Sequence, residues 1–112
     1  MTMDGFAERW IEDWNSHDID RILAHYDAKI RFHSPNALRR VGVGIVEGID
    51  ALRACWTSAL AARPQLHFTL KKAFLGHLSV SIHYVDELGR DVIETAVFNE
   101  EARVVFGTAC YA

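Results

Sequence analysis

The chain has 112 residues, of which 50% are hydrophobic and 24% are charged, and its formal net charge is −3. This length predicts one domain, residues 1–112, with a single core and room for one internal pocket. The mildly acidic balance argues against nucleic-acid binding, which usually needs a basic stripe. No stretch approaches the ~20 apolar residues of a membrane span.

Two short helices are predicted at the N-terminus. Phe6, Trp10 and Trp14 recur every four residues, a spacing typical of a helix with one apolar stripe. The polar residues 15–18 end this helix, and Asp18 is well placed to cap the next one. The second helix has apolar residues at the spacing i, i+3, i+4, i+7, namely Ile19, Ile22, Leu23 and Tyr26. Together these segments predict a helical hairpin.

A strand, a loop and a third helix follow. Residues 29–34 alternate between polar and apolar side chains and stop at Pro35, which predicts a strand. Residues 36–48 are rich in glycine and predict a flexible loop with short strand pieces beside a pocket. The third helix is expected to start near Ile49 and to end at Pro64.

The second half of the chain predicts strands only. Alternating segments lie near residues 66–71, 80–85, 91–98 and 104–111, with turns at 87–89 and 99–102. Helices followed by an antiparallel meander predict an α+β fold, with the helices packed on one face of a curved sheet. The last strand is apolar on both faces, which is what a sheet buried on both sides would show, one side against helices and the other against a second subunit.

The strand at 91–98 carries a carboxylate on an apolar face. By alternation Glu94 shares its face with Val92, Ala96 and Phe98. An unpaired buried carboxylate costs several kcal/mol or takes up a proton, so Glu94 should either have a partner or line a cavity. In a cavity its pKa should rise, which would suit a general acid or base near neutral pH. The competing interpretation is a structural carboxylate bonded to Tyr84 or to a tryptophan N–H.

The order and spacing of these segments resemble the nuclear transport factor 2-like superfamily and, within it, the SnoaL-like (polyketide-cyclase-like) proteins. The resemblance covers nearly the whole chain and rests on Tyr84 and on residues 10–18, 22–26, 32–35, 48–52 and 89–98. It implies a cone, in which a bent sheet wraps a long helix and the open end is a pocket. Many members are homodimers through the outer sheet face, and we predict a homodimer here. The same cone serves isomerases, dehydratases, epoxide hydrolases, cyclases and non-catalytic carriers, so the fold does not fix the function.

Within this superfamily the Glu94 strand is similar to a strand of ketosteroid isomerase. The resemblance places Glu94 where that enzyme keeps a protonated acid that donates a hydrogen bond to an oxyanion. However, Ser34 stands where the isomerase has its general base, and Trp10 stands where it has an oxyanion tyrosine. A hydroxyl with no neighbouring base cannot take a proton from carbon, so steroid isomerisation of that type is disfavoured.

Several further side chains are candidates for the pocket. Tyr84 is the favoured partner of Glu94 on the neighbouring strand, although a one-residue slip of the hairpin would place His83 there instead. His33 and His83 are expected near the pocket mouth, where a neutral histidine can exchange a proton. Ser34 should point inward as a hydrogen-bond donor. The predicted ligand-binding residues are Trp14, Tyr26, His33, Ser34, Trp56, Phe98 and Tyr111, with ordinary packing as the competing interpretation for each.

The motifs indicate neither a metal nor a nucleotide. The six histidines show no HxH or HExxH spacing. The glycine-rich residues 42–48 miss the GxGxxG pattern because Glu47 occupies the last glycine position. The pairs at 39–40 and 71–72 are expected to be solvated basic faces. We therefore predict a protein that binds an apolar small molecule, with cofactor-independent acid/base catalysis by Glu94, or alternatively a non-catalytic binding or dimerisation module.

The cysteines and the first residues predict a cytoplasmic protein. Cys55 and Cys110 are far apart in the sequence and form no CxxC pair. We expect two free, buried thiols in a reducing compartment. The N-terminus also lacks the basic segment and apolar run of a signal peptide.

Overall fold

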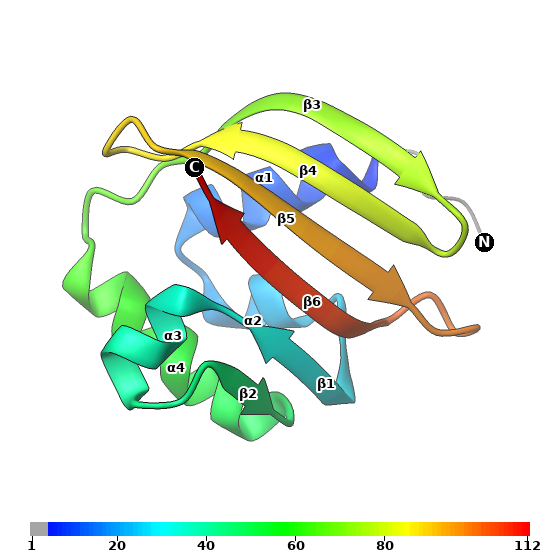
Figure 1. Ribbon diagram of the computed structural model, residues 1–112, viewed down its shortest axis with the longest axis horizontal. Helices are drawn as coiled ribbons and strands as arrows, with labels where there is room; N and C mark the ends of the chain where they lie inside the picture. The colour runs from blue at the N-terminus through cyan, green and yellow to red at the C-terminus, as the bar shows by residue number, and fades with distance from the viewer. Residues whose placement is uncertain (1–4) are drawn as a thin grey trace.

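A six-stranded sheet and four helices form the fold of residues 5–112, the part of the chain that the computed structural model describes (Figure 1). The helices are α1 (Phe6–Ser16), α2 (Ile19–Leu23), α3 (Pro35–Val41) and α4 (Ile49–Ala62). The strands are β1 (Tyr26–His33), β2 (Ile45–Glu47), β3 (Thr69–Gly76), β4 (Ser79–Val85), β5 (Asp91–Phe98) and β6 (Val104–Tyr111). The predicted α+β class is confirmed.

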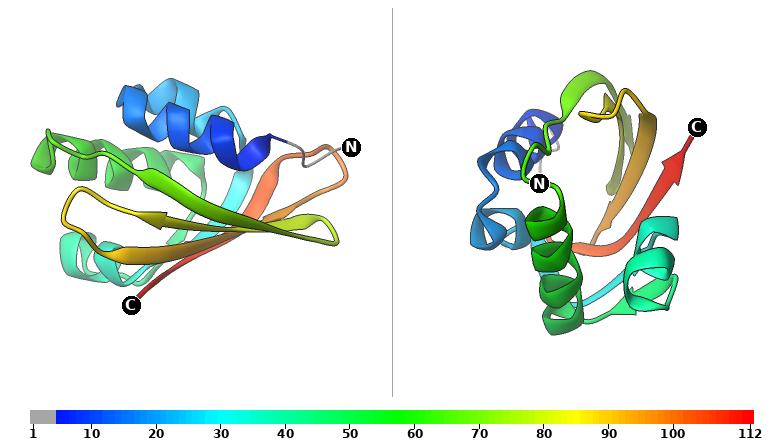
Figure 2. Two further views of the ribbon diagram at one scale, coloured as in Figure 1. Left: turned by 90° about the horizontal axis from the view of Figure 1, so that it is seen from above. Right: turned by 90° about the vertical axis from the view of Figure 1, so that its left-hand side faces the viewer.

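The sheet has the order β2-β1-β6-β5-β4-β3, and it bends around the helices. The pair β1–β6 is parallel, and all other neighbours are antiparallel. Seen end-on in the right panel of Figure 2, β3 and β1 approach the two sides of a helical layer formed by α1, α2 and α4. The shorter α3 packs against α4 and β2. The predicted curved sheet with helices inside its bend is therefore confirmed.

Aromatic side chains fill the space between the helices and the sheet. Phe6, Trp10 and Trp14 form the buried stripe of α1, as their spacing predicts. Trp14 packs edge-on against Trp56 of α4, with 4.9 Å between ring centroids, and Trp10 stacks on Phe68 at 5.9 Å. Aromatic pairs at these distances add specific contact energy to the burial of apolar area.

The structure corrects the predicted extent of the second helix. This helix ends at Leu23, and Tyr26 is the first residue of β1. The apolar spacing that included Tyr26 therefore joins a helix to a strand. Asp18 does cap the helix, because its side chain accepts hydrogen bonds from the N–H groups of Asp20 and Arg21.

The segment predicted as a glycine-rich loop contains a helix. Ser34 caps α3 by accepting hydrogen bonds from the N–H groups of Asn36 and Ala37. Pro35 occupies the first turn, and Gly42 closes the helix with φ = 84°. Serine, proline and glycine at these positions are a helix start and stop signal. The prediction missed this helix signal because the glycines at 42, 44 and 48 dominated the segment. The short strand piece that was predicted in the segment is β2.

Two smaller predictions also need correction. Strand β3 starts at Thr69, so residues 66–68 are irregular although Leu66 and Phe68 are buried. Both cysteines are free, but only Cys55 is buried. Alternation in β6 points Ala109 inward and leaves Cys110 exposed on the other face.

Candidate functional site

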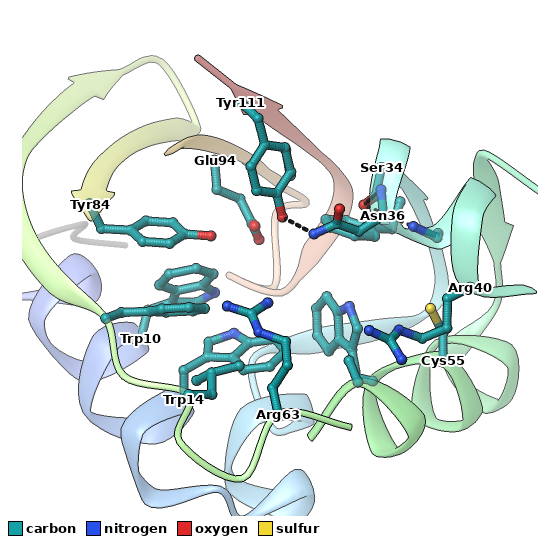
Figure 3. Close-up of a pocket in the computed structure, with 17 residues that line it drawn as sticks. Trp10, Trp14, Ser34, Asn36, Arg40, Cys55, Arg63, Tyr84, Glu94 and Tyr111 are labelled. Atoms are coloured by element: carbon teal, nitrogen blue, oxygen red, sulfur yellow. Dashed lines mark hydrogen bonds between the residues drawn. The ribbon is translucent and has the colours of Figure 1, made fainter. Parts of the chain in front are cut away.

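A cavity of about 50 Å³ lies between the inner face of the sheet and helices α1, α3 and α4 (Figure 3). This is several times the volume that one buried water needs, but below the 300–1,000 Å³ typical of sites for drug-sized ligands. The cavity therefore admits a small group, and a larger ligand needs side chains at its mouth to move. Its walls are largely aromatic and include Trp10, Trp14, Phe32, Trp56 and Phe68.

Glu94 faces this cavity from the centre of β5. The residue is only 5% exposed, and its carboxyl has no hydrogen bond or ion pair among residues 5–112. Burial disfavours the charged form and raises the pKa of Glu94 to about 8. The carboxyl is therefore mostly protonated at pH 7 and presents an O–H donor to the cavity.

Two tyrosine hydroxyl groups point toward the same space as Glu94 (Figure 3). The strand register pairs Tyr84 with Val92 and Ile82 with Glu94, so Tyr84 and Glu94 lie on one face two positions apart. Burial, together with the nearby Glu94 charge, raises the pKa of Tyr84 well above 10. The hydroxyl of Tyr111 accepts a hydrogen bond of 2.6 Å from Nδ2 of Asn36. Burial and Glu94 also raise the pKa of Tyr111, to about 12. Both phenols therefore remain donors at neutral pH.

The structure brings most predicted site residues to the cavity. Its lining includes Trp14, Ser34, Trp56, Tyr84, Glu94 and Tyr111. The Ser34 hydroxyl oxygen accepts the two capping hydrogen bonds of α3, and its own O–H remains for donation. The indole N–H of Trp14 is buried and has no hydrogen-bond partner within residues 5–112. Such orphan donors are uncommon in folded proteins.

Four predicted residues lie elsewhere, and the placement expected for each was wrong. His83 pairs with Ile93 on the outer face of the sheet and bonds Asp91 at 2.9 Å. His33 packs on the ring of Phe106, also outside the cavity. Alternation puts both histidines on the face opposite Glu94. The other two residues are buried outside the cavity lining. Phe98 packs against Phe6, and the hydroxyl of Tyr26 accepts a hydrogen bond from Nε1 of Trp10.

Sequence reasoning missed two cations of the lining, Arg40 and Arg63. Arg40, at the end of α3, was expected on a solvated face. Arg63 follows the last residue of α4 and is held by two hydrogen bonds of 2.7 and 2.8 Å to Glu87. Both positions depend on where a helix ends relative to the sheet, and the spacing of apolar residues carries no signal for that relation.

The described part of the chain contains no group of three His, Cys, Asp or Glu residues that could hold a metal ion. Among its helices none is long and apolar enough to cross a membrane.

Solved structures described as nuclear transport factor 2-like and as having a cystatin-like fold share this fold, at 13% and 14% identity and a TM-score of 0.78 each. The model of the SnoaL-like domain family matches residues 7–105, so the chain belongs to the SnoaL-like family. A comparison with curated proteins gives no match.

Solved structures with the same fold fall into near and distant relatives. A SnoaL-like protein of unknown function from Burkholderia thailandensis is 36% identical, with a TM-score of 0.93 over 100% of this chain and 98% of that one. A candidate isomerase of the SnoaL-like family from Agrobacterium tumefaciens is 16% identical, with a TM-score of 0.75 over 95% and 93%. TerC co-crystallised with polyporic acid is 10% identical, with a TM-score of 0.77 over 94% and 87%.

Proposed function

We propose that this SnoaL-like protein binds an apolar small molecule in its cavity and that Glu94 acts on that molecule as an acid/base group. The supporting observation is a buried carboxyl that faces the cavity without a hydrogen-bond partner in the described residues. Burying such a group costs free energy. A ligand that forms a hydrogen bond with this carboxyl would offset that cost.

The proposed chemistry uses donors that the cavity already holds. A protonated Glu94 can donate a hydrogen bond or a proton to a carbonyl oxygen of the ligand. The orphan N–H of Trp14 and the hydroxyl of Tyr84 line the same cavity. Donors fixed in advance in an apolar site stabilise negative charge that develops on oxygen. Isomerisation, dehydration, cyclisation and hydrolysis are the reaction types that fit, and none of them requires a cofactor.

Two distant relatives support small-molecule chemistry in a cone of this kind. TerC was co-crystallised with polyporic acid, and the Agrobacterium tumefaciens protein is described as a candidate isomerase. Both are too different in sequence to transfer a substrate, so the proposal for this chain stops at a class of ligand.

The alternative function is binding without turnover. Ser34 occupies the position where the resembling isomerase keeps its base, and no histidine is found among the described lining residues. Without a second proton acceptor the cavity would hold a ligand without changing it. This observation keeps a non-catalytic module as the second candidate.

Deuterium exchange into a neutral aromatic ketone separates these two functions. Hydrogens on the methyl group of 2-acetylnaphthalene exchange in D₂O when Glu94 donates to the carbonyl oxygen and a solvent water or hydroxide ion takes the methyl proton, which gives the enol; the reverse step returns a deuteron to the carbon. We expect the protein to accelerate this exchange and Glu94→Gln to reduce the acceleration about 100-fold, the usual scale for general acid/base catalysis. The exposed Glu100→Gln in the turn after β5 is the matched control and should leave the rate unchanged.

Two results would contradict parts of the proposal. An unchanged rate in Glu94→Gln would exclude Glu94 as the acid/base group. Quenching of tryptophan fluorescence measures binding of the ketone. Binding without deuterium exchange would favour the non-catalytic module.

We also propose that the protein is a cytoplasmic homodimer that associates through the outer face of its sheet. Ile93 on this face is 45% exposed, which is high for a strand-centre isoleucine. Sedimentation at micromolar concentration should give a dimer, and a monomer would contradict the proposal.

A further inference from the structure

A ring of arginines lies beside the cavity. A hollow of about 370 Å³ adjoins it and is lined by Asn36, Arg39, Arg40, Arg63, Leu88 and Arg90. Three of these residues, Asn36, Arg40 and Arg63, also line the inner cavity. The arginines come from three separate parts of the chain, namely α3, the end of α4 and the β4–β5 turn.

The charges around this mouth do not cancel. Arg63 pairs with Glu87 and Asp86, and Arg90 pairs with Asp86. Four arginines against these two carboxylates leave a local charge of +2 (4 − 2), on a chain whose net charge is −3. A positive mouth on a negative protein concentrates anions at that place.

Within residues 5–112, Arg39 and Arg40 are the two arginines of this mouth without a counter-charge, and Arg40 also lacks a hydrogen bond. In the part of the chain that the structure describes, the guanidinium of Arg40 makes no ion pair and no hydrogen bond. Its charge acts on the thiol of Cys55, another residue of the cavity lining. By contrast, Arg63 is fixed by Glu87 and Asp86, and Arg39 donates to the amide oxygen of Asn36 at 2.6 Å. Arg40 is therefore the group at the mouth that is left to bind an anion.

We infer that the ligand is an amphipathic carboxylate. Its aromatic body enters the cavity toward Glu94 when side chains at the mouth move, and its carboxylate is bound by Arg40 at this mouth, where Arg63 also lies (Figure 3). A guanidinium matches a carboxylate through two parallel N–H···O bonds. The aromatic walls suit the other end of such a molecule. This inference rests on the proposed function and adds the chemical class of the ligand.

Two probes of the same shape test the inference. 2-Naphthoate carries a carboxylate, whereas 2-acetylnaphthalene carries a neutral acetyl group in the same place. Their dissociation constants are measured by quenching of tryptophan fluorescence at pH 7 for the wild type, Arg40→Gln and Arg31→Gln. Arg31 is an exposed arginine of β1 outside both hollows, so it controls for the loss of one charge.

The wild type should bind naphthoate about tenfold more tightly than the ketone, because a charged hydrogen bond contributes roughly this much to affinity. Arg40→Gln should weaken naphthoate binding about tenfold more than ketone binding and so remove that preference, and Arg31→Gln should preserve it. Equal affinities for the two probes in the wild type, or an equal loss in both variants, would overturn the inference while the proposed apolar site stands. Failure of both probes to bind would overturn the proposed function itself.

Discussion

Asp86 and Glu94 are equally buried carboxyl groups, each 5% exposed, that have opposite surroundings. Asp86 accepts hydrogen bonds from the N–H groups of Leu88 and Arg90 and from the Arg90 side chain. Burial acts to raise its pKa, but these bonds outweigh burial and the pKa of Asp86 lies below its usual value. Glu94 has no such partners, and its pKa rises to about 8. Burial alone therefore does not set the charge of a carboxyl group, and its partners distinguish a structural acid from a candidate site acid.

Removing Asp86 should produce the largest loss of stability. Asp86→Ala leaves Arg90 without its carboxylate and removes the oxygen that accepts from two backbone N–H groups of the β4–β5 turn. We expect the free energy of unfolding to fall by about 3 kcal/mol, as for other buried pairs that lose one partner. Urea unfolding at pH 7 measures the change. Asp91→Ala, which removes an exposed carboxylate bonded to His83, should cost less than 1 kcal/mol by the ~0–1 kcal/mol typical of surface pairs. Equal losses would contradict the comparison.

Replacing Glu94 should increase the free energy of unfolding at high pH, whereas replacing Asp86 lowers it. Its folded pKa of about 8 exceeds the ordinary value of 4.5, so the folded protein holds a proton that the unfolded chain releases. Below pH 4.5 the titration of Glu94 should not change the free energy of unfolding of the wild type. Between pH 4.5 and about 8 this free energy should fall by roughly 1.4 kcal/mol per pH unit.

Glu94→Gln should flatten this pH dependence. The variant buries an unpaired amide in place of an unpaired carboxyl, and the two costs are similar. It should therefore keep the unfolding free energy that the wild type loses as the pH rises to 9. Urea unfolding across pH 5–9 measures both profiles. Parallel profiles for the wild type and the variant would show that Glu94 is not the group that titrates.

The two indole N–H groups of α1 provide a smaller contrast of the same kind. Trp10 Nε1 donates to the Tyr26 hydroxyl at 3.0 Å, whereas Trp14 Nε1 has no partner in the described residues. Trp10→Phe should therefore cost about 1 kcal/mol more than Trp14→Phe, the usual net contribution of one hydrogen bond. Thermal or urea unfolding of both variants checks this difference. A greater loss in Trp14→Phe would contradict it.

Alternation along strands predicted the central part of the site. It placed Glu94 on the inner face and favoured Tyr84 over His83 beside it, a choice that the observed register settles, and the same rule put Ser34 on this face. It did not fix position along the strand, which is why Phe98 shares the face of Glu94 yet packs against Phe6, away from the cavity. A periodic pattern shows which face of the sheet a side chain points from, but it does not show how far along the strand the residue lies from the cavity.

The rest of the site depends on the ends of elements. Arg40 lies in the last turn of a helix that was not predicted, and Arg63 lies at the end of α4. Their place at the mouth follows from how α3 and α4 meet the sheet and from the carboxylates of the β4–β5 turn. These are long-range contacts, and the local sequence around the two arginines resembles that of ordinary solvated residues.

The central claim is that Glu94 is a protonated carboxyl in the cavity at neutral pH, and an NMR titration of the glutamate side-chain carboxyl carbons tests it most directly. The signal that disappears in Glu94→Gln identifies the residue. We expect this signal to titrate with a pKa of about 8, well separated from the other glutamates. A midpoint near the ordinary value of 4.5 would contradict the account.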